Sequence, residues 1–136
     1  MSPQLVVDEH LDYWKVTQAI ARWMSAAQIG FEIGRKSLPD DNIRAILRTI
    51  KRRTFITIDK GFYRCEFCDK RYCIVFFNMS LVREDEIPHL LRKLLRFSEF
   101  QTSKKRMGKV IRVSRGGGIH FFDSRTGSEK YLPWTP

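Results

Sequence analysis

The sequence predicts an α/β fold with a mainly parallel central sheet and helices on both of its faces. Apolar runs of strand length alternate along the chain with segments whose apolar residues recur at helical spacing. Such alternation is typical of strand–helix–strand units, in which neighbouring strands run parallel. At 136 residues, with 43% hydrophobic residues, the chain is expected to fold as one domain with a substantial core.

The first half of the chain is expected to supply three strands and two helices. Residues 5–7 form the first strand, and residues 12–27 carry apolar side chains at helical spacing. A short segment, 29–33, is flanked by glycine and is a candidate second strand. Asp40 is a candidate N-cap for the second helix, which carries an apolar stripe and ends in basic residues. The third strand follows at 54–58.

The second half is expected to supply three more strands, with one helix among them. The helix is predicted over residues 85–97, because Asp85, Glu86 and Pro88 suit a helix start. The strands are expected at 73–77, 109–114 and 119–123, the last two joined by a glycine-rich turn. Residues 126–136 are polar and are expected to form a loosely attached tail, so the predicted domain covers residues 1–125.

The charge of the chain indicates a polyanionic partner. Lys and Arg number 25 against 15 Asp and Glu, which gives a formal net charge of +10, and each phosphate that such a surface neutralises releases counterions. The densest basic run contains Lys104, Lys105 and Arg106, which form either a patch for an RNA backbone or a solvated loop. No apolar run approaches the roughly 20 residues that span a bilayer, and no secretory signal is visible, so we expect a cytoplasmic protein without a membrane partner.

Three acidic positions stand out against this basic background. Asp8 follows the first strand directly, and Asp59 follows the third. Ligands of open α/β sheets bind at the carboxyl ends of strands, so these two carboxylates are expected to converge. Asp40, or its neighbour Asp41, would approach from a helix start. Converging carboxylates suit Mg²⁺, which takes oxygen ligands and is often held by one or two carboxylates.

The cysteines give a weaker indication of chemistry. Three is an odd number, which argues against a disulfide framework. A zinc site on Cys65, Cys68 and Cys73 would need a fourth ligand, since structural zinc is four-coordinate. His10, His89 and His120 lie at no motif spacing from them. A redox pair and a loop with semi-buried thiols are the alternatives.

Three motifs in order resemble those of the PIN-like nucleases, in particular the small predicted toxins of toxin–antitoxin systems. Residues 7–11, Val-Asp-Glu-His-Leu, match a strand followed by Asp-Glu-Asn-Leu, except that His10 replaces Asn. Asp40 lies three residues ahead of Ile43, as in the family. Residues 57–62, Thr-Ile-Asp-Lys-Gly-Phe, match Thr-x-Asp-x-Asp-Phe, except that Gly61 replaces the second Asp. The resemblance covers roughly residues 4 to 97.

The resemblance implies a three-layer α/β/α PIN-like fold and a ribonuclease that depends on Mg²⁺ or Mn²⁺. Asp8, Asp40 and Asp59 would be its metal ligands and catalytic residues, with RNA and a cognate antitoxin as partners and a homodimer as a further assembly. RNA contacts are expected at Lys60, Lys104, Lys105 and Arg106. At Gly61 the chain lacks a family carboxylate, which Glu9, Glu66 or Asp69 would have to replace. The alternative is a catalytically weak or inactive nucleic-acid-binding module.

Overall fold

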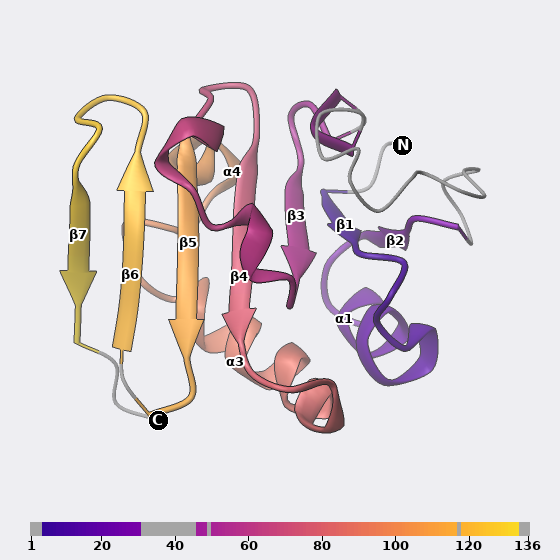
Figure 1. Cartoon of the computed structure of the whole chain (residues 1–136). Helices are drawn as coiled ribbons and strands as arrows, with labels where there is room; N and C mark the ends of the chain where they lie inside the picture. The colour runs from indigo at the N-terminus through magenta and orange to yellow at the C-terminus, as the bar shows by residue number, and fades with distance from the viewer. Residues whose placement is uncertain (1–3, 31–45, 49, 117, 134–136) are drawn as a thin grey trace.

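The computed structural model describes residues 4–30, 46–48, 50–116 and 118–133, which form one mixed sheet with helices packed against it (Figure 1). Its seven strands have the order β2-β1-β3-β4-β5-β6-β7. The first five in chain order run parallel, and the last two are antiparallel to their neighbours. The strands are β1 (Leu5–Val7), β2 (Ala26–Gln28), β3 (Thr54–Thr57), β4 (Cys73–Asn78), β5 (Lys109–Ser114), β6 (Gly118–Asp123) and β7 (Glu129–Leu132).

The strand order reverses between β1 and β3. β2 lies on one side of β1, whereas β3, β4 and β5 follow one another on its other side. In open α/β sheets such a reversal opens a crevice at the carboxyl ends of the two strands, and ligands bind there. A ligand site is therefore expected at the edge where the parallel strands end.

Helices cover both faces of the sheet. On one face, α1 (Gln18–Ala21) and α3 (Ile87–Leu94) contribute Ile20, Ile87 and Leu91 to a core that also contains Leu5 and Val7. On the other face, Val6 and Phe55 pack with Ile50 and Phe62. Figure 1 shows the segment between β3 and β4 crossing the front of the sheet, with α3 and α4 (Ser103–Arg106) behind it. The prediction of an α/β fold is thus confirmed, and that of a mainly parallel sheet holds for β1 to β5 of a mixed sheet.

Short helices join these elements. The bounds are η1 (Tyr13–Thr17), η2 (Lys60–Phe62), η3 (Cys65–Phe67) and η4 (Leu81–Glu86). Among the described residues, no helix combines the length and the apolar character that crossing a membrane requires.

Three elements differ from the sequence prediction. The helix predicted over 12–27 ends near Arg22, because the chain turns there and β2 begins at Ala26. β2 therefore occupies 26–28; of the strand predicted over 29–33, residues 31–33 lie outside the described residues. Alanine and glutamine favour strands little, but β2 pairs with β1 in parallel, and Ala27 and Gln28 are buried there. The predicted helix over 85–97 is α-helical only in α3 and begins as η4.

The predicted tail is partly incorporated into the sheet. β7 pairs with β6 in antiparallel register, with Tyr131 opposite His120. Gly127, which has a positive φ of 68°, lies in the turn that brings β7 back against β6. The folded domain therefore continues through Leu132 and does not stop at residue 125.

Candidate active site

Asp8 and Asp59 lie at the same edge of the sheet, at the reversal of strand order. Asp8 follows β1 directly, and Asp59 comes two residues after the end of β3. β1 and β3 are paired in parallel, with Val7 opposite Ile56, so both strands end at this edge. The negative charge of Asp59 is one of the influences that raise the pKa of Asp8, which reflects how near the two carboxylates are.

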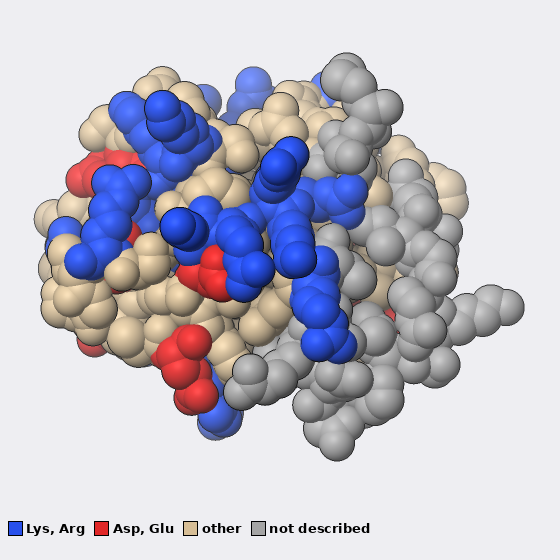
Figure 2. Space-filling view, turned by 90° about the horizontal axis from the view of Figure 1, so that it is seen from above, with Lys and Arg blue, Asp and Glu red and all other residues tan. Residues whose placement is uncertain are grey.

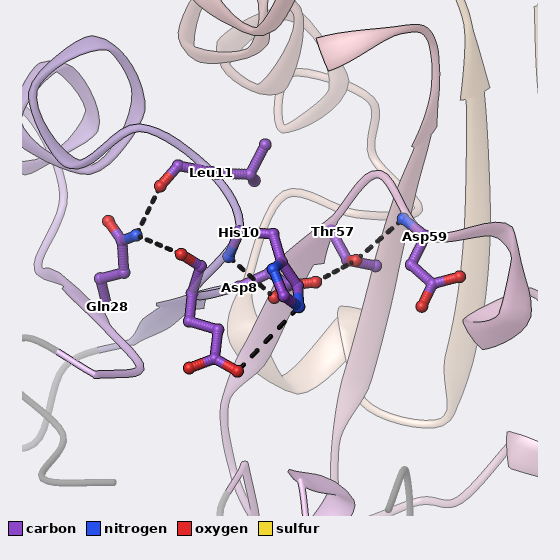
Figure 3. A network of polar contacts seen from close by, with 7 residues as sticks. Asp8, His10, Leu11, Gln28, Thr57 and Asp59 are labelled. Carbon is purple, nitrogen blue, oxygen red and sulfur yellow. Dashed lines mark hydrogen bonds and ion pairs between the residues drawn. The ribbon is translucent and has the colours of Figure 1, made fainter. Parts of the chain in front are cut away.

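The hydroxyl group of Thr57 joins the two acidic residues (Figure 3). Thr57 Oγ1 donates to Asp8 Oδ2 at 2.7 Å and accepts from the backbone N–H of Asp59 at 3.0 Å. Thr57 is fully buried as the last residue of β3, so its rotamer is held by packing. In Figure 3 the two aspartate side chains lie on either side of this threonine. One short buried side chain therefore sets their relative position.

The carboxyl group of Asp8 is held largely away from water. Its residue is only 5% exposed, and Oδ1 accepts from the backbone N–H of His10 at 3.3 Å. Burial raises the pKa of Asp8, and the hydrogen bonds from Thr57 and His10 oppose this increase. A nearby cation would favour the ionised form, so Asp8 is suited to a positively charged ligand.

Asp59 is exposed and begins a short helix. Its Oδ1 accepts from the backbone N–H of Gly61 at 2.9 Å, which caps η2. Oδ2 accepts no hydrogen bond from the part of the chain that the structure describes, and it remains available to a ligand. A Cβ atom at Gly61 would lie 3.1 Å from Asp59 Oδ1. The position where the resemblance expects a further carboxylate is thus directly beside Asp59.

Gln28 holds the loop after Asp8 in place, a role that the sequence analysis missed. Its Nε2 donates to the carbonyl oxygens of Leu11 at 2.6 Å and Glu9 at 3.4 Å, while Oε1 accepts from Thr17 Oγ1 at 2.6 Å. The side chain is fully buried. The signal in the sequence is a single amide within the otherwise apolar run 26–29, since a buried glutamine needs partners.

The third predicted ligand is not placed. Asp40 and its rival Asp41 lie outside the described residues. Within the described ranges, no three His, Cys, Asp or Glu side chains are grouped as metal ligands would be. The described centre therefore consists of two carboxylates, Asp8 and Asp59.

The three acids considered as replacements at Gly61 fall in different places. Glu9 lies at the edge of Asp8, where its Oε1 is 4.0 Å from His10 Nε2. Glu66 and Asp69 belong to the segment that leads into β4, whose start is at the opposite edge. Asp69 also forms an ion pair with Arg71 at 2.7 Å. Only Glu9 of these three is positioned to assist Asp8 and Asp59.

A basic and aromatic hollow adjoins Asp59. Lys60, predicted to contact RNA, is exposed and forms part of its wall. The guanidinium group of Arg112 lies 5.0 Å from the ring centre of Tyr63, and its Nε is buried with no hydrogen-bond partner among the described residues. The lining residues are Lys60, Gly61, Tyr63, Arg64, Phe76, Asn78 and Arg112.

The other predicted RNA contacts lie far from this hollow. Lys104 and Lys105 are exposed on α4, which precedes β5 and therefore lies where the parallel strands begin. Arg106 is fully buried: its Nε donates to Thr54 Oγ1 at 3.0 Å and its Nη1 to the carbonyl oxygen of Phe100 at 3.0 Å. Burial lowers the pKa of Arg106. The prediction that Arg106 contacts RNA is therefore wrong, because its side chain is used inside the protein.

Cys65 and Cys68 lie together and are hydrogen-bonded through their side chains, but Cys73 does not join them. Cys73 is buried in the core that contains Leu5 and Val7, whereas Cys68 packs against the core on the opposite face of the sheet. Cys65 is exposed, and its Sγ donates to the carbonyl oxygen of Gly127. Burial raises the pKa of Cys68 to about 11 and that of Cys73 to about 12, so both are thiols at neutral pH. Of the three, only Cys68 is a semi-buried thiol, since Cys65 is exposed and Cys73 is fully buried.

Comparison with known proteins finds no match to a family model, to a curated protein or to a solved structure. Function is therefore inferred from the geometry around Asp8 and Asp59.

Proposed function

We propose that this protein is an endoribonuclease of the PIN-like kind that uses Mg²⁺ or Mn²⁺ to hydrolyse RNA phosphodiesters. The observation that carries the proposal is the pair formed by Asp8 and Asp59, which the Thr57 hydroxyl joins at the reversal of strand order. Two oxygen-donor side chains at the carboxyl edge of a parallel sheet suit a hard divalent cation.

The donor set fits such a cation. Asp8 is buried with a raised pKa, and the adjacent Asp59 keeps one carboxylate oxygen free of described partners. These two residues would hold the ion, and Asp40 is the proposed third ligand. When bound, the ion would polarise the scissile phosphate and lower the pKa of a water molecule.

The hollow beside Asp59 would hold the substrate strand. Lys60, Arg64 and Arg112 offer cationic donors to a phosphate, and the Tyr63 ring packs against the Arg112 guanidinium group and holds it at this wall. The buried Nε of Arg112 keeps an unused donor at this wall. Binding here would orient the backbone against the two carboxylates, which is the main contribution that positioning makes to phosphoryl chemistry.

We also propose a cognate antitoxin as a protein partner. Trp14 and Val82 are the most exposed large apolar side chains among the described residues, at 74% and 89%. They lie on η1 and η4, which are joined by a hydrogen bond from the Asp12 backbone N–H to Glu84 Oε1. A protein partner that covered this surface would lie beside the loop that follows Asp8.

The test is cleavage of a labelled RNA with Mn²⁺ and with EDTA. Asp8→Asn and Asp59→Asn should each abolish the Mn²⁺-dependent cleavage. Asp123→Asn is the matched control: Asp123 is also buried at a strand end and accepts from a backbone N–H two residues on, but β6 runs antiparallel and ends at the other edge. Cleavage by both site variants at a rate within a few-fold of the control would refute the site.

A second candidate function is favoured by one observation. Only two carboxylates are grouped among the described residues, and glycine occupies position 61. A catalytically weak or inactive RNA-binding module would bind the same labelled RNA and leave it intact at every Mn²⁺ concentration. That result would favour the binding module over the nuclease.

A further inference from the structure

A strongly basic surface of the described structure lies at the edge of the sheet opposite to Asp8 and Asp59. Figure 2 looks onto this edge and shows Lys and Arg side chains crowded across it. Its cations line a series of adjoining hollows. We call this surface the cationic edge and define it by Lys51, Arg52, Lys70, Arg71, Lys104 and Arg125.

The topology explains why these residues gather there. Lys51 and Arg52 precede β3, Lys70 and Arg71 precede β4, and Lys104 lies on α4, which precedes β5. Because β3, β4 and β5 are parallel, all three starts lie at one edge. Arg125 joins them because β6 runs antiparallel and ends there.

The cationic edge cannot contact the same phosphate as the acidic pair. Asp59 lies beyond the far end of β3, and the six-residue β4 spans the sheet between the two edges. At about 3.3 Å per residue, such a strand is roughly 20 Å long. The cations here therefore serve a different part of a ligand from the part at Asp8.

Most cations of the cationic edge have no ion-pair partner among the described residues. Arg71 forms an ion pair with Asp69, but Lys51, Lys70, Lys104 and Arg125 make no ion pair with any acid in the described ranges. Arg52 has a left-handed backbone with a φ of 66°, and its N–H donates to the carbonyl oxygen of Arg71. A left-handed arginine is uncommon, and such strain tends to occur where function requires it.

The arrangement of these cations suits a phosphate backbone. They occur at the ends of neighbouring strands, which are spaced about 4.8 Å apart, so they form a row across β3, β4, β5 and β6. A nucleic-acid strand carries phosphates at regular intervals and loses condensed counterions when cations approach them. We propose that the cationic edge binds the phosphate backbone of RNA without metal and independently of Asp8 and Asp59.

The test is the salt dependence of RNA binding in EDTA. A labelled single-stranded RNA is titrated with the full chain carrying Lys70→Ala, Lys104→Ala and Arg125→Ala together. The matched control carries Lys15→Ala, Arg22→Ala and Arg92→Ala, three exposed cations away from the cationic edge with the same loss of charge. At about 0.7 per phosphate for a single strand, three lost contacts should flatten the slope of log affinity against log salt by about two units.

The control triple variant should keep the wild-type slope, and both variants should keep the wild-type unfolding midpoint. Equal slopes in the two variants would overturn the proposal, because net charge alone would then explain binding. Competition by polyglutamate as effective as by unlabelled RNA would also overturn it in favour of an acidic protein partner. The variant Asp8→Asn should bind RNA in EDTA as the wild type does, so a failure of the nuclease proposal leaves this result unaffected.

Discussion

Thr57 ends β3 and Asp8 directly follows the neighbouring strand β1, and the threonine hydroxyl donates to the aspartate over 2.7 Å. The same oxygen accepts from the Asp59 backbone at 3.0 Å, so one buried group contacts both acidic residues. Because Thr57 is fully buried and is the last residue of β3, its position is determined by the sheet. The spacing of the acidic pair is therefore a property of the sheet and not of a loop.

Replacing Thr57 with Val should weaken both the fold and the site. Valine has nearly the same shape but leaves the Asp59 N–H and Asp8 Oδ2 without this partner, which should cost about 1–3 kcal/mol of unfolding free energy. Mn²⁺ binding, measured by calorimetry, should weaken as well. Thr57→Ser keeps the hydroxyl and is the control: it should lose stability through the missing methyl group but retain Mn²⁺ affinity. Equal Mn²⁺ affinities in Val and Ser variants would contradict the positioning role.

The pKa of Asp8 predicts how stability varies with pH. Its folded pKa is raised above the ordinary 3.8, mainly by burial. Below pH 3.8 Asp8 is protonated in both states and carries no penalty. As pH rises from 3.8 through the folded pKa, the unfolded state ionises first and the wild type loses stability. The stability of Asp8→Asn relative to the wild type should therefore increase across this window and then level off.

Urea unfolding of both proteins between pH 3 and 7, in EDTA, measures this difference. Adding Mn²⁺ at pH 7 should stabilise the wild type, by about 2.7 kcal/mol at 100 times the dissociation constant, and leave Asp8→Asn unchanged. A stability difference that does not vary with pH would mean that Asp8 is not desolvated in solution.

Gly61 offers a direct test of the missing carboxylate. Its backbone has no positive φ, so a side chain is compatible with the backbone there. Its Cβ would lie 3.1 Å from Asp59 Oδ1, which requires Asp59 to move by a few tenths of an ångström. Gly61→Asp should tighten Mn²⁺ binding because it adds an oxygen ligand beside Asp59, whereas Gly61→Ala carries the same steric cost without the charge. Mn²⁺ affinity is measured by calorimetric titration. Equal affinities in the two variants would show that position 61 is not part of the metal site.

Variants of Arg106 and of its neighbour Lys105 should differ in stability, because only the Arg106 side chain is buried. Arg106→Met keeps much of the volume but removes donors to Thr54 and to the carbonyl oxygens of Phe100 and Gln101. We expect a loss of about 1–3 kcal/mol of unfolding free energy, since buried acceptors are left unpaired. Lys105→Met, next to it but exposed, should leave the unfolding midpoint unchanged. An Arg106 variant as stable as the wild type would contradict the structural role.

Much of the sheet could be predicted because its strands are locally distinctive. Residues 54–58, 73–77, 109–114 and 119–123 are apolar, β-branched or aromatic, and each corresponds closely to an observed strand. The strand β2 was not predicted at 26–28, because Ala26, Ala27 and Gln28 have little strand preference of their own. Their conformation comes from pairing with β1, a contact that no local pattern encodes.

The candidate site, like the sheet, could be predicted from the sequence only in part. Asp8 and Asp59 could be brought together from sequence, because each follows an apolar strand and parallel strands end at one edge. The roles of Gln28 and Thr57 depend on which buried polar groups meet after folding. The burial of Arg106 was hidden because a basic run ordinarily indicates exposure.

The edge of the sheet at which Lys104 lies follows from the sequence alone. A helix that precedes a strand of a parallel sheet lies at the edge where strands begin, and a residue that follows a strand lies at the opposite edge. That rule alone separates Lys104 from Asp59 by the height of the sheet.

The cationic edge lies at one end of β4 and the acidic pair at the other, so charge is distributed unevenly along the sheet. A polyanion approaching from a distance experiences this asymmetry before any contact forms, and it would turn the protein so that Lys70 and Lys104 arrive first. Collisions would then be productive from a wider range of initial orientations, and the association rate would fall as salt shortens the reach of the field. An RNA held at both the cationic edge and the hollow beside Asp59 must span the roughly 20 Å between them, so short fragments would bind less tightly than long ones.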